Sequence, residues 1–214
     1  MEKIKAVEKD KKETVLDGCF KLFLERKQGN VTVPELERVL GVTRGKFFYY
    51  YKNMEEITTL TVEHYFKKVE DYFSFFYQGE KTTLRDFIFQ YVDNWKRFDQ
   101  SIIEVTDNSG SSVIKFFLHA TMLHPDFESK VKVLFDKEQK CWEEVLRKAI
   151  ENKEIREDID VPVTATKFYC INMGVLTQSY LIPNSFKAST LLMLFLSLYD
   201  DIKKKTEEKR NIFD

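Results

Sequence analysis

Proline and glycine are both scarce in this chain. Its 214 residues include only 4 prolines and 7 glycines, while 43% of the residues are hydrophobic. Few turn formers and few helix breakers favour long helices over sheets, and this length and hydrophobic content allow one or two domains with a sizeable core. We therefore expect an all-α fold.

Cysteine is also rare. Cys19, Cys141 and Cys170 are an odd, widely spaced set, without the paired spacing of a metal site. Reduced, buried thiols in a cytoplasmic protein are the plain interpretation, and a redox sensor is the alternative. We expect no metal and no cofactor.

Long apolar runs are missing as well. The longest uncharged run, residues 168–186, contains asparagine, glutamine, serine, threonine and proline, and would be a poor membrane span. Charges are spread through the first 13 residues, which excludes a secretory signal. The sequence therefore predicts a cytoplasmic protein without a membrane partner.

Three helix starts fall within residues 32–56, which read TVPELERVLGVTRGKFFYYYKNMEE. Thr32 with Glu35 forms a capping box, so a helix should begin at residue 33 and end at Gly41. Thr43 can cap a second helix over residues 44–52 after a tight turn, and Asn53 with a glutamate three residues later begins a third. This spacing is typical of a helix-turn-helix.

The side chains of the middle helix divide by face. Phe47 and Tyr51 should point inward together with Leu36 and Val39. The remaining arc is basic and aromatic, and Gly45 would allow close approach of the backbone to a duplex. The residues of that arc are Arg44, Lys46, Tyr49, Tyr50 and Lys52.

Charge agrees with this interpretation. Residues 1–52 hold 12 Lys/Arg against 8 Asp/Glu, although the whole chain has a net charge of −1. We therefore expect the basic N-terminal segment to be the part of the chain that binds DNA. Because the excess of positive charge is small, we expect DNA affinity to be moderate and salt-dependent. We also expect that two copies of this N-terminal helix-turn-helix segment are needed for useful specificity.

Over about residues 10–60 the chain resembles the TetR family of bacterial transcription regulators. That family has a leading helix, a Gly-Val-Ser/Thr turn and a Gly-x-x-Tyr-x-His-Phe recognition helix, and this chain has TVLDGCFKLFLERKQGN followed by GVTRGKFFYYYKNMEEI. The resemblance implies an effector-responsive dimeric regulator. Carried over by position, it implies DNA contacts from Thr32, Thr43, Arg44, Gly45, Lys46, Tyr49, Tyr50 and Lys52.

Three positions depart from the family pattern. Phe48 stands where a phosphate-binding tyrosine is usual, Tyr50 replaces a common histidine, and Met54 replaces a lysine that often meets phosphate. Lost phosphate contacts should weaken binding uniformly without changing sequence preference.

The breaks after the head predict six further helices and about nine in all. We expect a head over residues 1–53 and an effector-binding and dimerisation body over residues 54–214. The further helices are predicted at 54–77, 83–105, 112–123, 126–152, 162–182 and 185–206.

The middle helices concentrate aromatic residues, which suit a pocket for an apolar or aromatic small molecule. Such a stripe is also the ordinary pattern of a core. The candidate pocket residues are Phe66, Phe73, Tyr91, Trp95, Phe98, Phe117, His119 and Trp142.

The last two helices carry more apolar residues than one core-facing stripe requires. A four-helix contact between two subunits would use the surplus, and the alternative is that another helix of the same subunit covers it. The candidate interface residues are Phe168, Ile171, Val175, Leu191, Phe195 and Leu198.

Together these patterns predict a ligand-responsive repressor that binds a two-fold symmetric operator in double-stranded DNA as a homodimer. One alternative is a helical protein-binding adaptor that has lost sequence-specific DNA binding. An enzyme using His119 and His124 is a weaker alternative, because two histidines five residues apart do not share a helix face and no catalytic motif is present. We expect no enzymatic activity.

Overall fold

The computed structural model describes residues 2–25, 31–41, 43–78, 83–106, 118, 120–121, 126–182, 185 and 187–204. These residues form helices and no named strand, which confirms the predicted all-α class. The helices are α1 (Glu2–Glu25), α2 (Val33–Leu40), α3 (Arg44–Tyr50), α4 (Met54–Gln78), α5 (Leu84–Thr106), α7 (Phe127–Glu151), α8 (Val161–Leu181) and α9 (Ala188–Ile202). The helix predicted at 112–123 lies mostly outside the described residues, of which 118, 120 and 121 are helical.

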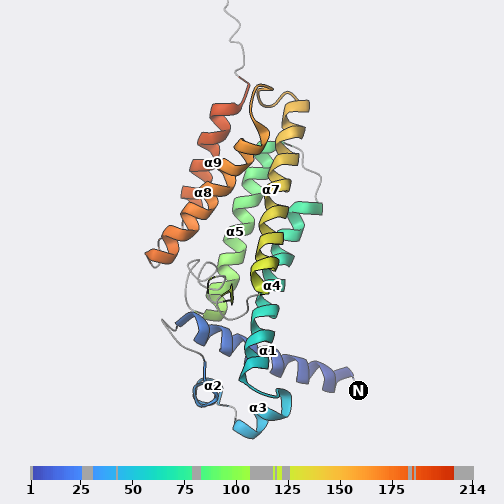
Figure 1. Cartoon of the computed structure of the whole chain (residues 1–214), viewed down its shortest axis with the longest axis vertical. Helices are drawn as coiled ribbons and strands as arrows, with labels where there is room; N and C mark the ends of the chain where they lie inside the picture. The colour runs from blue at the N-terminus through green and yellow to red at the C-terminus, as the bar shows by residue number, and fades with distance from the viewer. Residues whose placement is uncertain are drawn as a thin grey trace, which may run out of the picture.

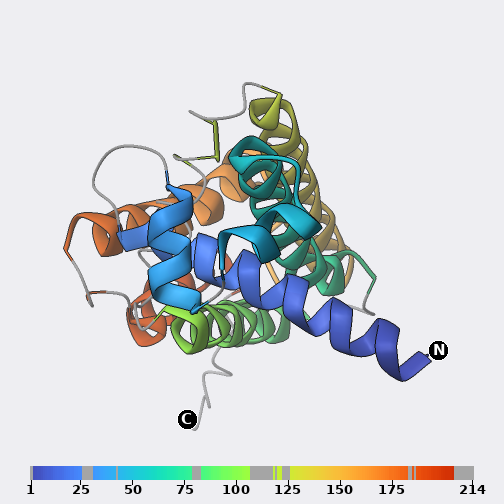
Figure 2. The same cartoon turned by 90° about the horizontal axis from the view of Figure 1, so that it is seen from below.

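The helices form a small head and a longer body (Figure 1). Helices α2 and α3 lie at one end of the molecule, and α4 runs from that end into the body beside α5 and α7. Helix α1 crosses the end of the body, as the view from below shows (Figure 2). Helices α8 and α9 pack side by side along one edge of the body.

The helix starts and ends predicted from Thr32, Gly41 and Asn53 are confirmed, whereas Thr43 stands at the N-cap of α3 without making a side-chain cap hydrogen bond. The Thr32 N–H donates to a Glu35 carboxylate oxygen at 2.9 Å, and α2 begins at the next residue. Gly41 ends α2 with a φ of 62°, a left-handed conformation that glycine adopts without a steric penalty. The Glu56 N–H donates to Asn53 Oδ1 at 2.8 Å at the start of α4.

Two helices end earlier than predicted because other groups use their next backbone donors or acceptors. Helix α3 stops at Tyr50, and the Lys52 N–H donates instead to the Glu56 carboxylate of the next helix. Helix α9 stops at Ile202, whose carbonyl accepts from the Arg156 N–H at 2.9 Å. The chain after α9 therefore pairs with the loop that follows α7.

The head has its own small core. Phe47 and Tyr51 are buried at 1% and 4% exposure, as predicted, with Leu36 at 0%. Val39 was predicted to join them and is 43% exposed instead. The reason is that α1 packs against α2 at Leu40, so the inward face of α2 is centred between residues 36 and 40.

Helix α1 contributes to both cores. Val15, Cys19 and Leu22 belong to the head cluster, whereas Phe20 and Leu24 belong to the large cluster of the body. The Phe20 ring stacks on Tyr65 of α4 with centroids 3.4 Å apart. The head is thus packed onto the body through α1.

Gly18 is where α1 approaches α2. A Cβ built on Gly18 would lie 2.4 Å from Leu40 Cδ2 and 2.9 Å from its Cγ, whereas Gly45 on α3 has nothing within 4 Å. Gly18→Ala should therefore lower the free energy of unfolding by about 1 kcal/mol or more, and Gly45→Ala should raise it by about 0.5 to 1 kcal/mol. Chemical denaturation measures both, and a Gly18→Ala protein as stable as the Gly45→Ala control would contradict the close packing.

Candidate DNA-binding surface and effector region

The outer face of α3 is exposed over its whole length. Arg44, Gly45 and Lys46 are exposed, and Tyr49 is 76% exposed. No acidic residue lies on this helix. These sequence-predicted contacts are therefore exposed together on α3, which lies at one end of the molecule (Figure 1).

The other predicted contacts border that face. Thr43 and Lys52, which flank α3, are exposed. Thr32 is exposed too, but its hydroxyl donates to the Glu35 carboxylate. Thr32 therefore acts first as a helix cap.

Tyr50 differs from its neighbours because it packs partly against the head core. Its ring meets Tyr49 edge-on with centroids 5.0 Å apart, and the Lys12 ammonium lies 5.9 Å from its centroid. The ring of Tyr50 thus packs against the ring of Tyr49.

Two of the departures from the family pattern can be placed on the surface. Phe48 is 43% exposed, and the Arg44 guanidinium lies 5.7 Å from its ring centroid. Met54 is half-buried against the head core. Phe48 therefore adds an apolar patch beside the basic residues of α3, while Met54 offers no substitute for a lysine.

A polar contact joins the head to α4. The Tyr65 hydroxyl donates to Asp17 of α1 at 2.5 Å, and the Lys68 ammonium lies 3.8 Å from the same carboxylate. Burial, and then the Asp17 hydrogen bond, raises the pKa of Tyr65. The hydroxyl stays protonated and keeps donating.

The predicted pocket aromatics are mostly core. Phe66, Tyr91, Trp95, Phe98 and Trp142 are at most 5% exposed. The side chain of Phe73, and all of Phe117 and His119, lie outside the described residues.

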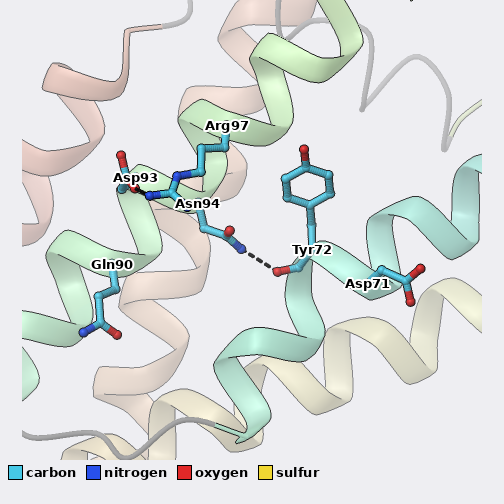
Figure 3. A pocket seen from close by; sticks show the side chains of 6 residues that line it. All are labelled: Asp71, Tyr72, Gln90, Asp93, Asn94 and Arg97. Carbon is cyan, nitrogen blue, oxygen red and sulfur yellow. Dashed lines mark hydrogen bonds and ion pairs between the residues drawn. The ribbon is translucent and has the colours of Figure 1, made fainter.

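A cleft of about 390 Å³ lies between α4 and α5, and charged, amide and tyrosine side chains line it (Figure 3). The Asn94 amide donates to the Tyr72 carbonyl across it. Arg97 pairs with Asp93 at 2.8 Å along α5. Of the predicted pocket residues, Phe66 lines a second cleft of about 340 Å³ between α4 and α7.

A polar cluster that the sequence analysis missed lies in the body core. Glu138 of α7 is 6% exposed, and its carboxylate accepts a hydrogen bond from the Tyr91 hydroxyl of α5. The Asn172 amide of α8 donates to the same hydroxyl at 2.8 Å. One signal could have revealed it: Glu138 falls in the apolar stripe of α7, between Leu134 and Cys141.

Burial raises the pKa of Glu138 to about 7, although the hydrogen bond from the Tyr91 hydroxyl lowers it. Among the described residues no Lys or Arg pairs with this carboxylate, and it is the only buried charged residue. A buried carboxylate without a cation is expensive, so this one is half-neutral near pH 7.

The predicted interface residues face inward instead. Phe168, Leu191 and Phe195 are fully buried in the protomer's own core, and Val175 is 8% exposed. Ile171 and Leu198 are half-buried against the same core. The correction has a simple cause, because α7 covers the face of α8 that carries these residues and α5 covers α9.

A different set of residues on α8 and α9 is exposed. On α8 these residues recur at alternating spacings of three and four, which places them on one stripe. The stripe contains Cys170, Gly174, Thr177 and Leu181 on α8, and Met193, Leu194 and Ser197 are exposed on the neighbouring helix α9.

Cys170 therefore corrects the expectation that all three thiols are buried. Cys19 and Cys141 are buried and free, and Cys170 is exposed and free. Burial raises the pKa of the Cys19 thiol to about 11, which makes it a poor nucleophile.

The enzyme alternative depends on two histidines. His119 and His124 lie outside the described residues, and the neighbouring Asp126 and Glu128 are exposed. In the described ranges no group of three or more His, Cys, Asp or Glu residues is placed to hold a metal ion. None of the helices described is both long and apolar enough to span a bilayer.

The arrangement of these helices matches many solved structures. A transcriptional regulator from Saccharomonospora viridis, solved in complex with choline, has a TM-score of 0.70 at 13% identity over 92% of this chain and 100% of that one. A TetR regulator from Haloarcula marismortui has a TM-score of 0.68 at 12% identity, over 92% and 100%. A TetR-family regulator from Cytophaga hutchinsonii has a TM-score of 0.66 at 14% identity, over 92% and 96%.

This chain has the TetR-type fold. The likeness spans head and body alike, so it extends the sequence resemblance from residues 10–60 to most of the chain. No protein-family model matches the sequence. At these identities the likeness establishes the fold, and the function must be argued from the site.

The raised pKa of Glu138 makes stability depend on pH. Its pKa is about 7 in the folded protein and near its ordinary value of 4.5 in the unfolded chain, so the folded state binds the extra proton between these values. The free energy of unfolding should therefore fall as pH rises from 5 to 8, by about 2 to 3 kcal/mol more in the wild type than in Glu138→Gln. Urea denaturation across this range measures it, and parallel pH profiles for the two proteins would refute the assignment.

Proposed function

We propose that this protein is a transcriptional regulator that binds a two-fold symmetric operator as a homodimer and releases it on binding a small effector. The observation that carries the proposal is the acid-free, exposed face of α3, held on a capped helix-turn-helix at the basic end of the chain. Residues 1–53 would read DNA, and residues 54–214 would bind the effector and the second subunit. A repressor in the cytoplasm is the simplest form, because a bound dimer blocks polymerase by occupying the site.

In this proposal α3 enters the major groove. Arg44 and Lys46 reach guanine edges or phosphates from the first turn, and Gly45 lets the backbone approach. Tyr49, supported by Tyr50, offers a hydroxyl and an apolar ring face to a thymine methyl. Thr43 and Lys52 contact the flanking phosphates.

The proposed dimer uses the exposed stripe of α8 and α9. Gly174, Cys170 and Ser197 are small, which permits close approach of helices from two subunits, and Leu181 and Met193 supply apolar area at 70% and 62% exposure. Figure 1 places this edge beside the body and away from α3, so both heads of a dimer stay free to face DNA. The spacing of the two α3 helices would then set the spacing of the half-sites.

The effector proposal rests on α4, which extends from the head into the body (Figure 1). A ligand that shifts the body end of α4 would move the head through the Asp17–Tyr65 contact. A coupling of about 1 to 3 kcal/mol would lower operator affinity about 5- to 150-fold. The Saccharomonospora viridis protein of the same fold was solved with choline, which supports a small-molecule site in this body.

A protein-binding adaptor is the second candidate. The exposed ring of Phe48 and the half-buried Met54 favour it, since both positions lack a phosphate-binding group. The two candidates differ in whether purified protein selects a duplex sequence.

Selection from a random-duplex library at two salt concentrations tests the DNA proposal. The wild type should enrich a two-fold symmetric site. On that site Lys46→Ala should weaken binding about tenfold and reduce the slope of log affinity against log salt by about 1. Lys140→Ala, which removes an exposed lysine from α7, should bind like the wild type. Retention without an enriched sequence, equal for all three proteins, would favour the adaptor.

The dimer proposal has its own test. Met193→Lys should dissociate the dimer at micromolar concentration, because it places a charge in the proposed contact. Val133→Lys, at a residue of α7 that is 50% exposed, is the matched control and should leave the dimer intact. Sedimentation equilibrium measures both, and a Met193→Lys dimer as stable as the control would place the interface elsewhere.

A further inference from the structure

The cluster of Glu138, Tyr91 and Asn172 has more hydrogen-bond acceptors than donors. The Tyr91 hydroxyl donates to Glu138, and the Asn172 amide nitrogen donates to the Tyr91 hydroxyl. Asn172 is 1% exposed, and its Oδ1 has no hydrogen-bond partner. The Trp142 indole N–H, in the same group of rings, is also buried without a hydrogen-bond partner. The site therefore holds an unsatisfied acceptor and an unsatisfied donor beside a buried carboxylate that no Lys or Arg of the described residues pairs with.

Aromatic rings surround this cluster. Trp142 lies 5.0 Å from Tyr91 and 5.4 Å from Phe195 between ring centroids, and it stacks on Phe168 at 4.4 Å. The Phe195 ring centroid lies 5.6 Å from that of Tyr91, so the four rings form one contiguous group. Because ring faces carry partial negative charge, they add to the potential of the carboxylate and attract cations.

A purely structural role explains this arrangement poorly. Replacing a buried charge by an apolar residue of similar volume is often neutral or stabilising, so packing alone gives no reason for a carboxylate here. The neighbouring helices present Tyr91 from α5, Asn172 and Tyr169 from α8 and Phe195 from α9. Among the described residues, no Lys or Arg of these helices forms an ion pair with Glu138. Buried ionisable groups in such surroundings mark functional sites.

We propose that Glu138, Asn172 and the rings of Tyr91, Trp142, Phe168 and Phe195 form a binding site for a small alkylammonium cation that carries a hydroxyl or N–H donor. The cation lies against the ring faces and neutralises Glu138, and its donor satisfies Asn172 Oδ1. That this cation acts as the effector rests on the function proposed above, whereas its binding to the site does not.

The site is closed by its own side chains, so the cation must bind a rearranged state. Trp142 belongs to α7 and Phe168 to α8, and separating their stacked rings moves one helix against the other. Helix α8 also carries the exposed stripe assigned to the dimer contact. Binding here would therefore change the arrangement of the two subunits, which an effector must do.

Calorimetric titration of the full-length protein with choline tests the site. Choline should bind, and its neutral carbon isostere 3,3-dimethyl-1-butanol should bind about tenfold more weakly or not at all, because the two differ only in charge. Glu138→Gln should weaken choline binding about tenfold or more, and Glu144→Gln, at an exposed residue of the same helix, should not. Fluorescence of Trp142 should respond to choline and be lost as a signal in Trp142→Phe.

The pH dependence gives an independent readout. Because a proton and the cation compete for Glu138, whose pKa is raised to about 7, choline affinity should fall about tenfold from pH 8 to pH 6. Equal binding of choline and its carbon isostere, absence of choline binding at millimolar concentration, or unchanged affinity in Glu138→Gln would each overturn the proposal. These titrations contain no DNA, so their failure leaves operator binding untouched, and failure of operator selection leaves them valid.

Discussion

The packing of α1 between two cores is the constraint on which the rest of the structure depends. One side of this helix gives Val15, Cys19 and Leu22 to the head, and another gives Phe20 and Leu24 to the body. A helix that belongs to both cores cannot tilt with one and leave the other in place, since packed interiors resist continuous deformation. The orientation of α3 is therefore tied to the body, because α3 packs on α2 and its Phe47 and Tyr50 join the head core that α1 enters.

The same helix explains why a small displacement in the body could reach the exposed face of α3, which we propose binds DNA. Asp17 on α1 accepts from Tyr65 of α4 and lies near Lys68, so a polar clamp accompanies the stacked rings of Phe20 and Tyr65. Polar contacts have directional geometry, and a rotation of α4 must either carry α1 with it or break them. Both routes alter the position of the head. The proposed effector response thus needs no long chain of residues between α4 and α3.

The sequence predicted those features that depend on neighbouring residues. Thr32, Gly41 and Asn53 act within a single turn of chain, and the helix boundaries they imply agree with the structure to within a residue. The face of α3 followed from helical spacing once Phe47 and Tyr51 were assigned inward. These inferences needed no knowledge of what lay across the fold.

Features set by distant packing could not be read in the same way. The apolar residues predicted for a subunit interface on α8 and α9 lie in the protomer's own core, because their inward direction depends on α7 and α5 and not on neighbouring residues of the chain. The prediction that Val39 is buried was wrong for the same reason, because the position of α1 over Leu40 decides which side of α2 is buried. Hydrophobic pattern gives the amount of buried surface, and only the tertiary contacts give its partner.

Glu138 is the clearest case in which local and global rules disagree. A glutamate is a good helix former, so its position in α7 violates no local preference, yet it occupies a core position where a charge is costly. In sequences that fold well, the local preference of a residue usually agrees with its place in the tertiary structure. Positions where the two disagree are functional more often than accidental. The carboxylate also lies where α5, α7 and α8 meet, so any change in its charge alters contacts on three helices at once. A group with that position is suited to convert the binding of one small cation into a rearrangement of the body.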